Sequence, residues 1–282
     1  MRLARHGPAG REQPIAAGAD GLWRDLRPLT SDVDGEFLST GIETLRVALD
    51  EGTLPALHAT IERFGPPVAR IGKIVCIGLN YMDHARETGA QIPAEPIIFL
   101  KTPDTVVGPD DAVLIPRTSR KTDWEVELAV IIGAEARYLD SPDESFSRVA
   151  GYAISNDVSE REFQNERGGQ WDKGKNCETF NPMGPWLVDT EEIGDPQDRA
   201  MHLWVNGTLR QDSRTSNMIF GIAHLVWYIS QFLVLHPGDV INTGTPSGVA
   251  LGRADHPYLK AGDVVELEIE GLGRQRQVMG SA

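Results

Sequence analysis

Cysteine, basic charge and long apolar runs are all scarce in this 282-residue sequence. Its two cysteines, Cys76 and Cys177, form no CxxC pair, and residues 1–7 show no signal-peptide pattern, so we expect neither a disulfide framework nor secretion and place the chain in the cytoplasm. No apolar run approaches the ~20 residues that span a bilayer. The balance of 27 basic and 41 acidic residues gives a net charge of −14, which makes nucleic acid and anionic membranes poor partners.

Three common motifs are also missing. Without GxxxxGK[ST] or GxGxxG the sequence gives no support for nucleotide binding, and without GxSxG a serine hydrolase is disfavoured. The tight turn at Gly244–Gly248 offers instead a hydroxyl group and free amides that suit a carboxylate.

Prolines and a glycine at 64–67 indicate a boundary between a small N-terminal domain, residues 1–70, and a larger domain, residues 71–282. In the first part we expect short strands and turns, then helices over 41–49 and 54–63. Strands dominate the second part, because short apolar runs are separated there by glycine and proline turns. The expected strands span 73–77, 97–100, 129–132, 149–155, 186–188, 203–205, 240–241 and 264–269.

The clearest helical periodicity spans residues 216–232, and a hairpin turn is expected at 271–273. His224 lies in that helix, where a lone histidine is more often a packed or surface residue than a ligand. Asn80 is expected to cap the segment that carries His84 and Glu87.

The most informative stretch is Asp123–Leu128. Successive strand side chains point to opposite faces, so Glu125 and Glu127 share one face with Asp123 while Trp124 and the apolar residues take the other. Same-face positions lie roughly 6–7 Å apart, close enough for both carboxylates to reach one hard cation. The alternative is a solvent-facing acidic strand.

Asp157 follows the apolar run 149–155, where a strand ends and a loop begins. As a third ligand it completes an all-oxygen set that suits Mg²⁺ and leaves positions for water and substrate; otherwise it is ordinary turn chemistry. Zinc is disfavoured because no cysteine or histidine cluster accompanies the carboxylates.

Other polar residues fit catalytic roles. His84 and Glu87 are three positions apart, so on a helix both face the same side and the carboxylate can orient an imidazole that activates water, although a surface ion pair has the same spacing. Lys175 and Lys173 stand on either side of Gly174 and can approach an anion closely, although such lysines are usually solvated.

Several motifs in the same order resemble those of the fumarylacetoacetate hydrolase superfamily. They are Gly78–Glu87, Phe99–Pro103, Asp123–Leu128, Asn156–Glu162, Lys175 with Pro182, and Thr243–Gly248. The resemblance covers about residues 70–280, and the ordered set is far more specific than any one motif.

This resemblance implies an α+β, strand-dominated fold with a mixed sheet rolled into a flattened barrel, and a homodimer. It implies that Mg²⁺ or Mn²⁺ is bound, that a histidine and glutamate activate water, and that a lysine lies beside the reacting carbonyl. The matching residues are Glu125, Glu127 and Asp157 for the metal, His84, Glu87 and Lys175 for catalysis, and Arg161, Gln164 and Thr245 for substrate contacts.

The loop Gln164–Lys175 is similar to the branch with 2,4-diketo-3-deoxy-L-rhamnonate and L-fuconate hydrolases. The resemblance therefore implies cleavage of the C3–C4 bond of a small 2,4-diketo acid, giving pyruvate and a hydroxy acid such as lactate. Two alternatives remain: a 2-keto acid decarboxylase, hydratase, isomerase or ureidoglycolate lyase of the same superfamily, and a catalytically inactive metal-binding scaffold.

Overall fold

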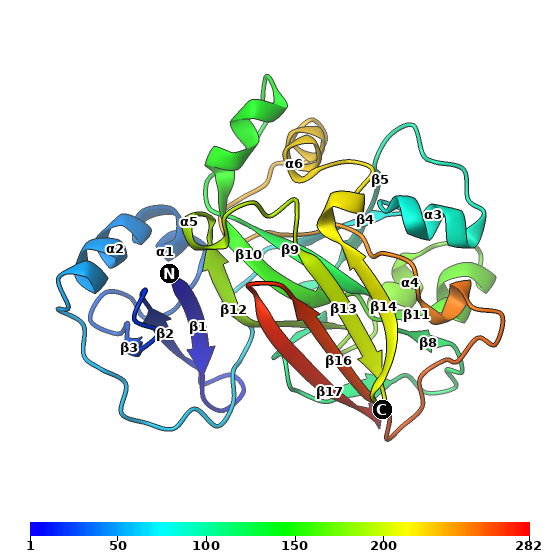
Figure 1. The fold of residues 1–282 in the computed structure, drawn as a ribbon, viewed down its shortest axis with the longest axis horizontal. Helices are drawn as coiled ribbons and strands as arrows, with labels where there is room; N and C mark the ends of the chain where they lie inside the picture. The colour runs from blue at the N-terminus through cyan, green and yellow to red at the C-terminus, as the bar shows by residue number, and fades with distance from the viewer.

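The computed structural model describes residues 1–282, and strands make up most of its regular structure (Figure 1). The N-terminal part contains β1 (Arg2–His6), β2 (Gln13–Ala17), β3 (Trp23–Asp25), α1 (Gly35–Thr40) and α2 (Ile42–Asp50). The strands that follow are β4 (Ile74–Gly78), β5 (Ile97–Lys101), β6 (Val106–Val107), β7 (Val113–Ile115), β8 (Thr122–Asp123), β9 (Val126–Ile132), β10 (Val149–Asn156), β11 (Ser159–Glu160), β12 (Asn181–Asp189), β13 (Ala200–Val205), β14 (Thr208–Arg214), β15 (Val240–Asn242), β16 (Val264–Ile269) and β17 (Gly273–Ser281). The helices among them are α3 (Met82–Thr88), α4 (Asp172–Lys175), α5 (Thr190–Ile193) and α6 (Ile222–Ser230).

Two large sheets form the body of the protein. One has ten strands, in the order β3-β2-β1-β12-β10-β9-β15-β4-β5 with β6 beside β12, and the other has five, in the order β14-β13-β16-β17-β7. Parallel pairing occurs at β4–β15, β6–β12 and β7–β17, so both sheets are mixed. The fold class expected from the sequence is confirmed, but the sheets stay open and are not closed into a barrel, because β16 and β17 pack across β9 and β10 without joining their hydrogen-bonded ladder.

Strand β9 is buried on both faces, and each face contributes to a different apolar core. Leu128, Val130 and Ile132 enter the larger apolar core of 35 buried residues, together with side chains of the five-stranded sheet and α6. Ala129 and Ile131 enter a second core of 18 buried residues, shared with the N-terminal helices. The alternation read from the sequence is therefore correct, and Trp124 and Val126 lie in the larger core as expected.

The N-terminal strands extend the ten-stranded sheet. β1 pairs with β12, with Leu3 opposite Leu187, and the segment occupies one end of the molecule while α3 and α4 lie toward the other (Figure 1). Leu3 is fully buried in the second core beside residues of β9 and β10. Residues 1–70 thus bury apolar surface against the rest of the chain, and their separation as a domain stays a prediction.

The helix expected over 54–63 is wrong, because this segment is an irregular chain tied to β3 by backbone hydrogen bonds between Asp25 and Pro55 and between Leu57 and Trp23. The helix expected over 216–232 begins only at Ile222. Asn80 causes the delay, because its backbone and side chain hold the amides of Ile219 and Phe220.

The expectation that Asn80 caps the following helix is also wrong. Tyr81 occupies the N-cap position of α3, and no side chain caps the helix. The other strand expectations agree with the structure to within a few residues, and β16 and β17 form the expected hairpin around Gly271–Gly273. No helix in the structure has the length and apolar character needed to cross a membrane.

Replacing Leu3 by alanine tests whether the N-terminal strands share the core. We expect Leu3→Ala to lower the free energy of unfolding by about 2–5 kcal/mol, measured by urea denaturation, because the side chain is fully buried. Leu22→Ala is the matched control: Leu22 is 61% exposed in the same part of the chain, so the change is expected to stay within about 0.5 kcal/mol. Equal effects of the two substitutions would contradict the shared core.

Candidate metal and active site

Two neighbouring strands bring three carboxylates together. In the β9–β10 ladder Glu127 lies opposite Ser155, and just beyond it the amide of Asp157 donates a 3.0 Å hydrogen bond to the carbonyl of Glu125. One carboxylate oxygen from each of Glu125, Glu127 and Asp157 lies within 4.8 Å of the others, and all three side chains are buried. The alternative of a solvent-facing acidic strand is excluded for these residues.

Three buried cations accompany these carboxylates. Arg161 Nε lies 2.8 Å from Asp123 Oδ2, and its Nη2 lies 2.7 Å from Glu125 Oε1. Lys175 Nζ lies 2.7 Å from Glu125 Oε2 and 2.9 Å from Asp157 Oδ2. Lys101, fully buried at the end of β5, binds the other oxygen of Asp157 and the carbonyls of Val158 and Phe180.

Glu127 is the carboxylate of this cluster without a cationic partner. Its Oε2 accepts a 2.8 Å hydrogen bond from the amide of Gly244, a residue at φ +96°, where a side chain would be strained. Burial, and then the charges of Asp157 and Glu125, raise the pKa of Glu127 well above its usual value. Burial also opposes ionisation of Glu125, but Lys175 and Arg161 outweigh it and lower the pKa of Glu125 to about 2.

The charge balance fits a bound cation. Four buried carboxylates, those of Asp123, Glu125, Glu127 and Asp157, face three buried cationic side chains, and the unmatched charge falls on Glu127, inside the trio. An isolated buried charge is costly, and a divalent ion beside Glu127 would remove that cost. Oxygen-only ligands favour Mg²⁺ or Mn²⁺ over softer metals.

Helix α3 places His84 beside Glu87. His84 Nδ1 lies 3.5 Å from Glu87 Oε2 and has no hydrogen-bond partner. Both carboxylate oxygens of Glu87 accept a hydrogen bond from the amide of Gly248, at 3.1 and 3.0 Å. Burial opposes ionisation of Glu87, but His84 and this amide lower its pKa below the usual value. A fixed, ionised carboxylate therefore faces one ring nitrogen of His84, and Nε2 is the nitrogen away from it.

The residues expected to contact substrate hold one another in place. Arg161 Nη1 donates a 3.0 Å hydrogen bond to Gln164 Oε1, so the arginine bridges Gln164 and two carboxylates. Thr245 donates to the carbonyl of Val126 at 2.9 Å and accepts from Gln211 at 2.9 Å. These bonds fix the side chains before any ligand arrives.

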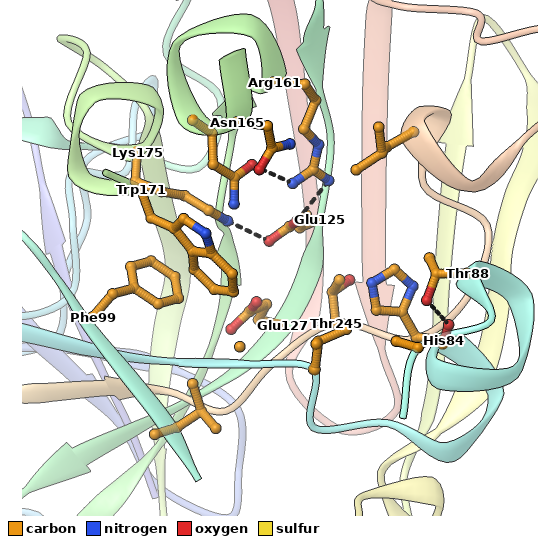
Figure 2. A pocket seen from close by; sticks show the side chains of 16 residues that line it. His84, Thr88, Phe99, Glu125, Glu127, Arg161, Asn165, Trp171, Lys175 and Thr245 are labelled. Carbon is orange, nitrogen blue, oxygen red and sulfur yellow. Dashed lines mark hydrogen bonds and ion pairs between the residues drawn. The ribbon is translucent and has the colours of Figure 1, made fainter. Parts of the chain in front are cut away.

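A cavity of about 210 Å³ joins these groups, and its volume is below the ~300–1,000 Å³ of sites for drug-sized ligands (Figure 2). Figure 2 shows Glu125 and Glu127 between Lys175 on one side and His84 on the other. Seven of the nine residues expected from the sequence line it, and Glu87 and Asp157 stand directly behind His84 and Lys175. The lining residues are Ile77, Gly78, Leu79, His84, Thr88, Ala90, Phe99, Glu125, Glu127, Arg161, Gln164, Asn165, Trp171, Lys175, Thr245 and Leu251.

Sequence reasoning missed Lys101, Phe99 and Trp171. The sequence shows Lys101 only as a single lysine that closes the apolar run Ile97–Leu100, and nothing local marks it as buried, because β5 is the edge strand of its sheet. Asp123 was expected on the acidic face. In the structure its carboxylate pairs with Arg161 instead of joining the trio, and it also accepts hydrogen bonds from the amides of Ala250 and Leu251. Phe99 and Trp171 lie in stretches that resemble the family, but nothing in the sequence indicated that they form a wall of the cavity, because that role depends on how the chain folds around them.

Comparison with known proteins identifies the family. Residues 73–279 match the family model described as fumarylacetoacetate (FAA) hydrolase C-terminal. The chain belongs to the fumarylacetoacetate hydrolase family. One curated relative is a protein of Sphingomonas sp. (strain SKA58) named 2,4-didehydro-3-deoxy-L-rhamnonate hydrolase. It is 49% identical, and the alignment covers 98% of this chain and 95% of the relative.

Solved structures of the family agree with the fold. The fumarylacetoacetate hydrolase of the psychrophile Exiguobacterium antarcticum is 33% identical, covers 100% of both chains and superposes with a TM-score of 0.88. A 2-hydroxyhepta-2,4-diene-1,7-dioate isomerase from Mycobacterium marinum is 30% identical over 100% of this chain and 98% of that one, with a TM-score of 0.75. Relatives with this fold therefore carry the names of both hydrolases and isomerases.

Substitution of Glu127 tests whether its carboxylate is needed to bind a cation. In EDTA we expect Glu127→Gln to raise the melting temperature, because the folded protein raises the pKa of Glu127 and the neutral amide avoids the cost of its charge at pH 7. With Mn²⁺ at about 100 times its dissociation constant, the native protein should gain about 2.7 kcal/mol and the variant far less. The control is Glu166→Gln, an exposed carboxylate paired with Lys121, which should keep the full gain. If Glu127→Gln kept the full stabilisation by Mn²⁺, binding of a cation by this trio would be contradicted.

Proposed function

We propose that this protein is a metal-dependent hydrolase that cleaves the C3–C4 bond of a 2,4-diketo acid, with 2,4-diketo-3-deoxy-L-rhamnonate or L-fuconate as its substrate. The observation that carries the proposal is the cavity in which His84 faces a buried trio of carboxylates and Lys175. The 49% identical relative named 2,4-didehydro-3-deoxy-L-rhamnonate hydrolase supports the choice of substrate.

Glu125, Glu127 and Asp157 would hold Mg²⁺ or Mn²⁺. When bound, the ion would supply positive charge that attracts the anionic substrate and stabilises the enolate charge that develops on cleavage. Arg161 holds Glu125, and Lys101 holds Asp157, so the ligand oxygens are oriented in advance.

The protein's own groups perform the proton transfers. His84, oriented by Glu87, takes a proton from a water molecule that attacks C4. Lys175 donates to the oxygen of C4 as negative charge collects there. The C3–C4 bond then breaks, C4 becomes the carboxyl carbon of the hydroxy acid, and C3 takes a proton to give pyruvate. For a rhamnonate-type substrate the products are pyruvate and lactate.

An isomerase of a 2-keto acid is the second candidate, because a structural neighbour at 30% identity carries an isomerase name. That chemistry keeps the enolate but uses no attacking water. The His84–Glu87 pair favours hydrolysis, because a histidine oriented by a carboxylate is suited to activating water. A catalytically inactive scaffold is disfavoured, because His84, Glu87 and Lys175 are all present at the cavity.

The proposal is tested by product analysis. Diketo-deoxy sugar acids, acylpyruvates, oxaloacetate and ureidoglycolate are incubated with the enzyme, with and without EDTA, and products are identified by NMR. We expect EDTA-sensitive formation of pyruvate and a hydroxy acid in equal amounts from a diketo sugar acid. Isomerised substrate would support the second candidate, whereas pyruvate with CO₂ from oxaloacetate alone would indicate a decarboxylase. Either result would contradict hydrolysis.

Variants test the assignment of roles. We expect His84→Ala to lower kcat by about 10²–10⁴ because it removes the base, and Lys175→Met to lower it by about 10²–10³ because it removes a donor to the charged oxygen. His224→Ala is the matched control, since His224 lies on α6 against Phe220, outside the cavity, and activity should be kept. Intact turnover in His84→Ala, measured by pyruvate release, would remove water activation from this residue.

A further inference from the structure

Two aromatic side chains border two separate hollows of the protein. Phe99, on β5, and Trp171, immediately before α4, line the 210 Å³ cavity of the active site. The same two residues line an outer groove of about 610 Å³. Their rings meet edge to face, with centroids 5.5 Å apart and an interplanar angle of 69°. The pair therefore forms a partition, with the carboxylates and Lys175 on its inner side.

The outer groove is mainly apolar. Its wall includes Ile98, Leu100, Phe232 and Leu233, and Phe232 is 63% exposed. Phe232 does not line the inner cavity. An alkyl chain that passed the partition would therefore find apolar surface to bury, whereas a chain confined to the inner cavity cannot reach it.

The position of the partition depends on Gly78 at the end of β4. A Cβ atom at residue 78 would lie 2.5 Å from Trp171 Cζ3, closer than real contacts allow, so the indole occupies space that only glycine leaves free. On the same inner side of the partition, Lys175 Nζ lies 5.0 Å from the centroid of the Phe99 ring. Figure 2 shows Phe99 and Trp171 on the Lys175 side of the cavity, away from His84.

We propose that the Phe99–Trp171 pair sets the length of the substrate: it admits 2,4-diketo acids with a short tail beyond C4 and blocks longer acyl chains from the outer groove. This inference rests on the proposed function, in which Lys175 binds the oxygen of C4. Because Lys175 Nζ lies 5.0 Å from the ring of Phe99, a C4 atom beside Lys175 would lie close to the partition, and a long tail on C4 would meet the two rings. The six-carbon sugar acid has only two carbons beyond C4, a tail of the short kind that the pair would admit.

The test uses straight-chain acylpyruvates, from acetylpyruvate to octanoylpyruvate, and compares kcat/KM for the longest and shortest members. In the native enzyme this ratio should be low. In Trp171→Ala it should rise by about fourfold for each methylene group that enters the groove, the factor expected for burying one methylene, and so by more than tenfold over the series. Gly78→Ala, whose methyl group would collide with the indole and displace it without removing it, should also change the ratio.

Phe232→Ala is the control, because its side chain touches the outer groove alone and the native ratio should be kept. A native enzyme that already accepts octanoylpyruvate as well as acetylpyruvate would overturn the proposal. So would an unchanged ratio in both Trp171→Ala and Gly78→Ala.

Binding measurements separate this inference from the proposed function. Dissociation constants for the same series are measured by NMR titration in the His84→Ala background, with and without Trp171→Ala. If the native enzyme hydrolyses none of the acids but Trp171→Ala still strengthens binding of the long members relative to the short ones, the hydrolase proposal fails and the partition stands. If no member binds, or if the length dependence is the same in both proteins, the partition is overturned.

Discussion

The buried ionic contacts around Glu125 and Asp157 are the constraint on which the site depends. Arg161 and Lys175 each bridge two carboxylates, and Lys101 holds the second oxygen of Asp157, so Glu125 and Asp157 cannot rotate independently. Buried ion pairs add little net stability, because desolvation offsets most of their attraction. Their contribution here is geometric: they orient ligand oxygens and leave Glu127 as the one carboxylate whose charge an added cation must balance.

The fold supplies this arrangement through the register of β9 and β10. A shift of one residue in that ladder would send Glu127 into the larger apolar core and Leu128 into the site, so the alternation that builds the core also fixes the carboxylates. The glycines serve the same end where the chain approaches itself closely: Gly244 offers its amide to Glu127, and Gly78 makes room for the indole of Trp171. Apolar packing and the polar site are thus specified by the same strands.

Part of the fold and of the site could be predicted from the sequence, and whether a feature was predictable depended on how local its contacts are. The alternation of Glu125 and Glu127 with apolar residues predicted which side chains share a face, because strand periodicity is local. The helix expected over 54–63 failed because its backbone hydrogen bonds go to β3, a long-range partner that no local pattern shows. For the same reason Lys101 and Trp171 were missed: Lys101 binds a residue 56 positions away, and Trp171 is placed by Gly78. The resemblance to a known family supplied the roles of His84 and Lys175, which spacing alone left open between catalysis and a solvated surface.

The most direct measurement of the central claim is the fate of solvent oxygen. Acetylpyruvate is cleaved in ¹⁸O-labelled water in the presence of Mg²⁺, and the acetate and pyruvate are examined by mass spectrometry after a short reaction. Attack of water on C4 predicts acetate that carries solvent oxygen in its carboxylate, formed in equal amount to pyruvate. Pyruvate without labelled acetate, or recovery of an isomer of the substrate, would contradict hydrolysis at this site.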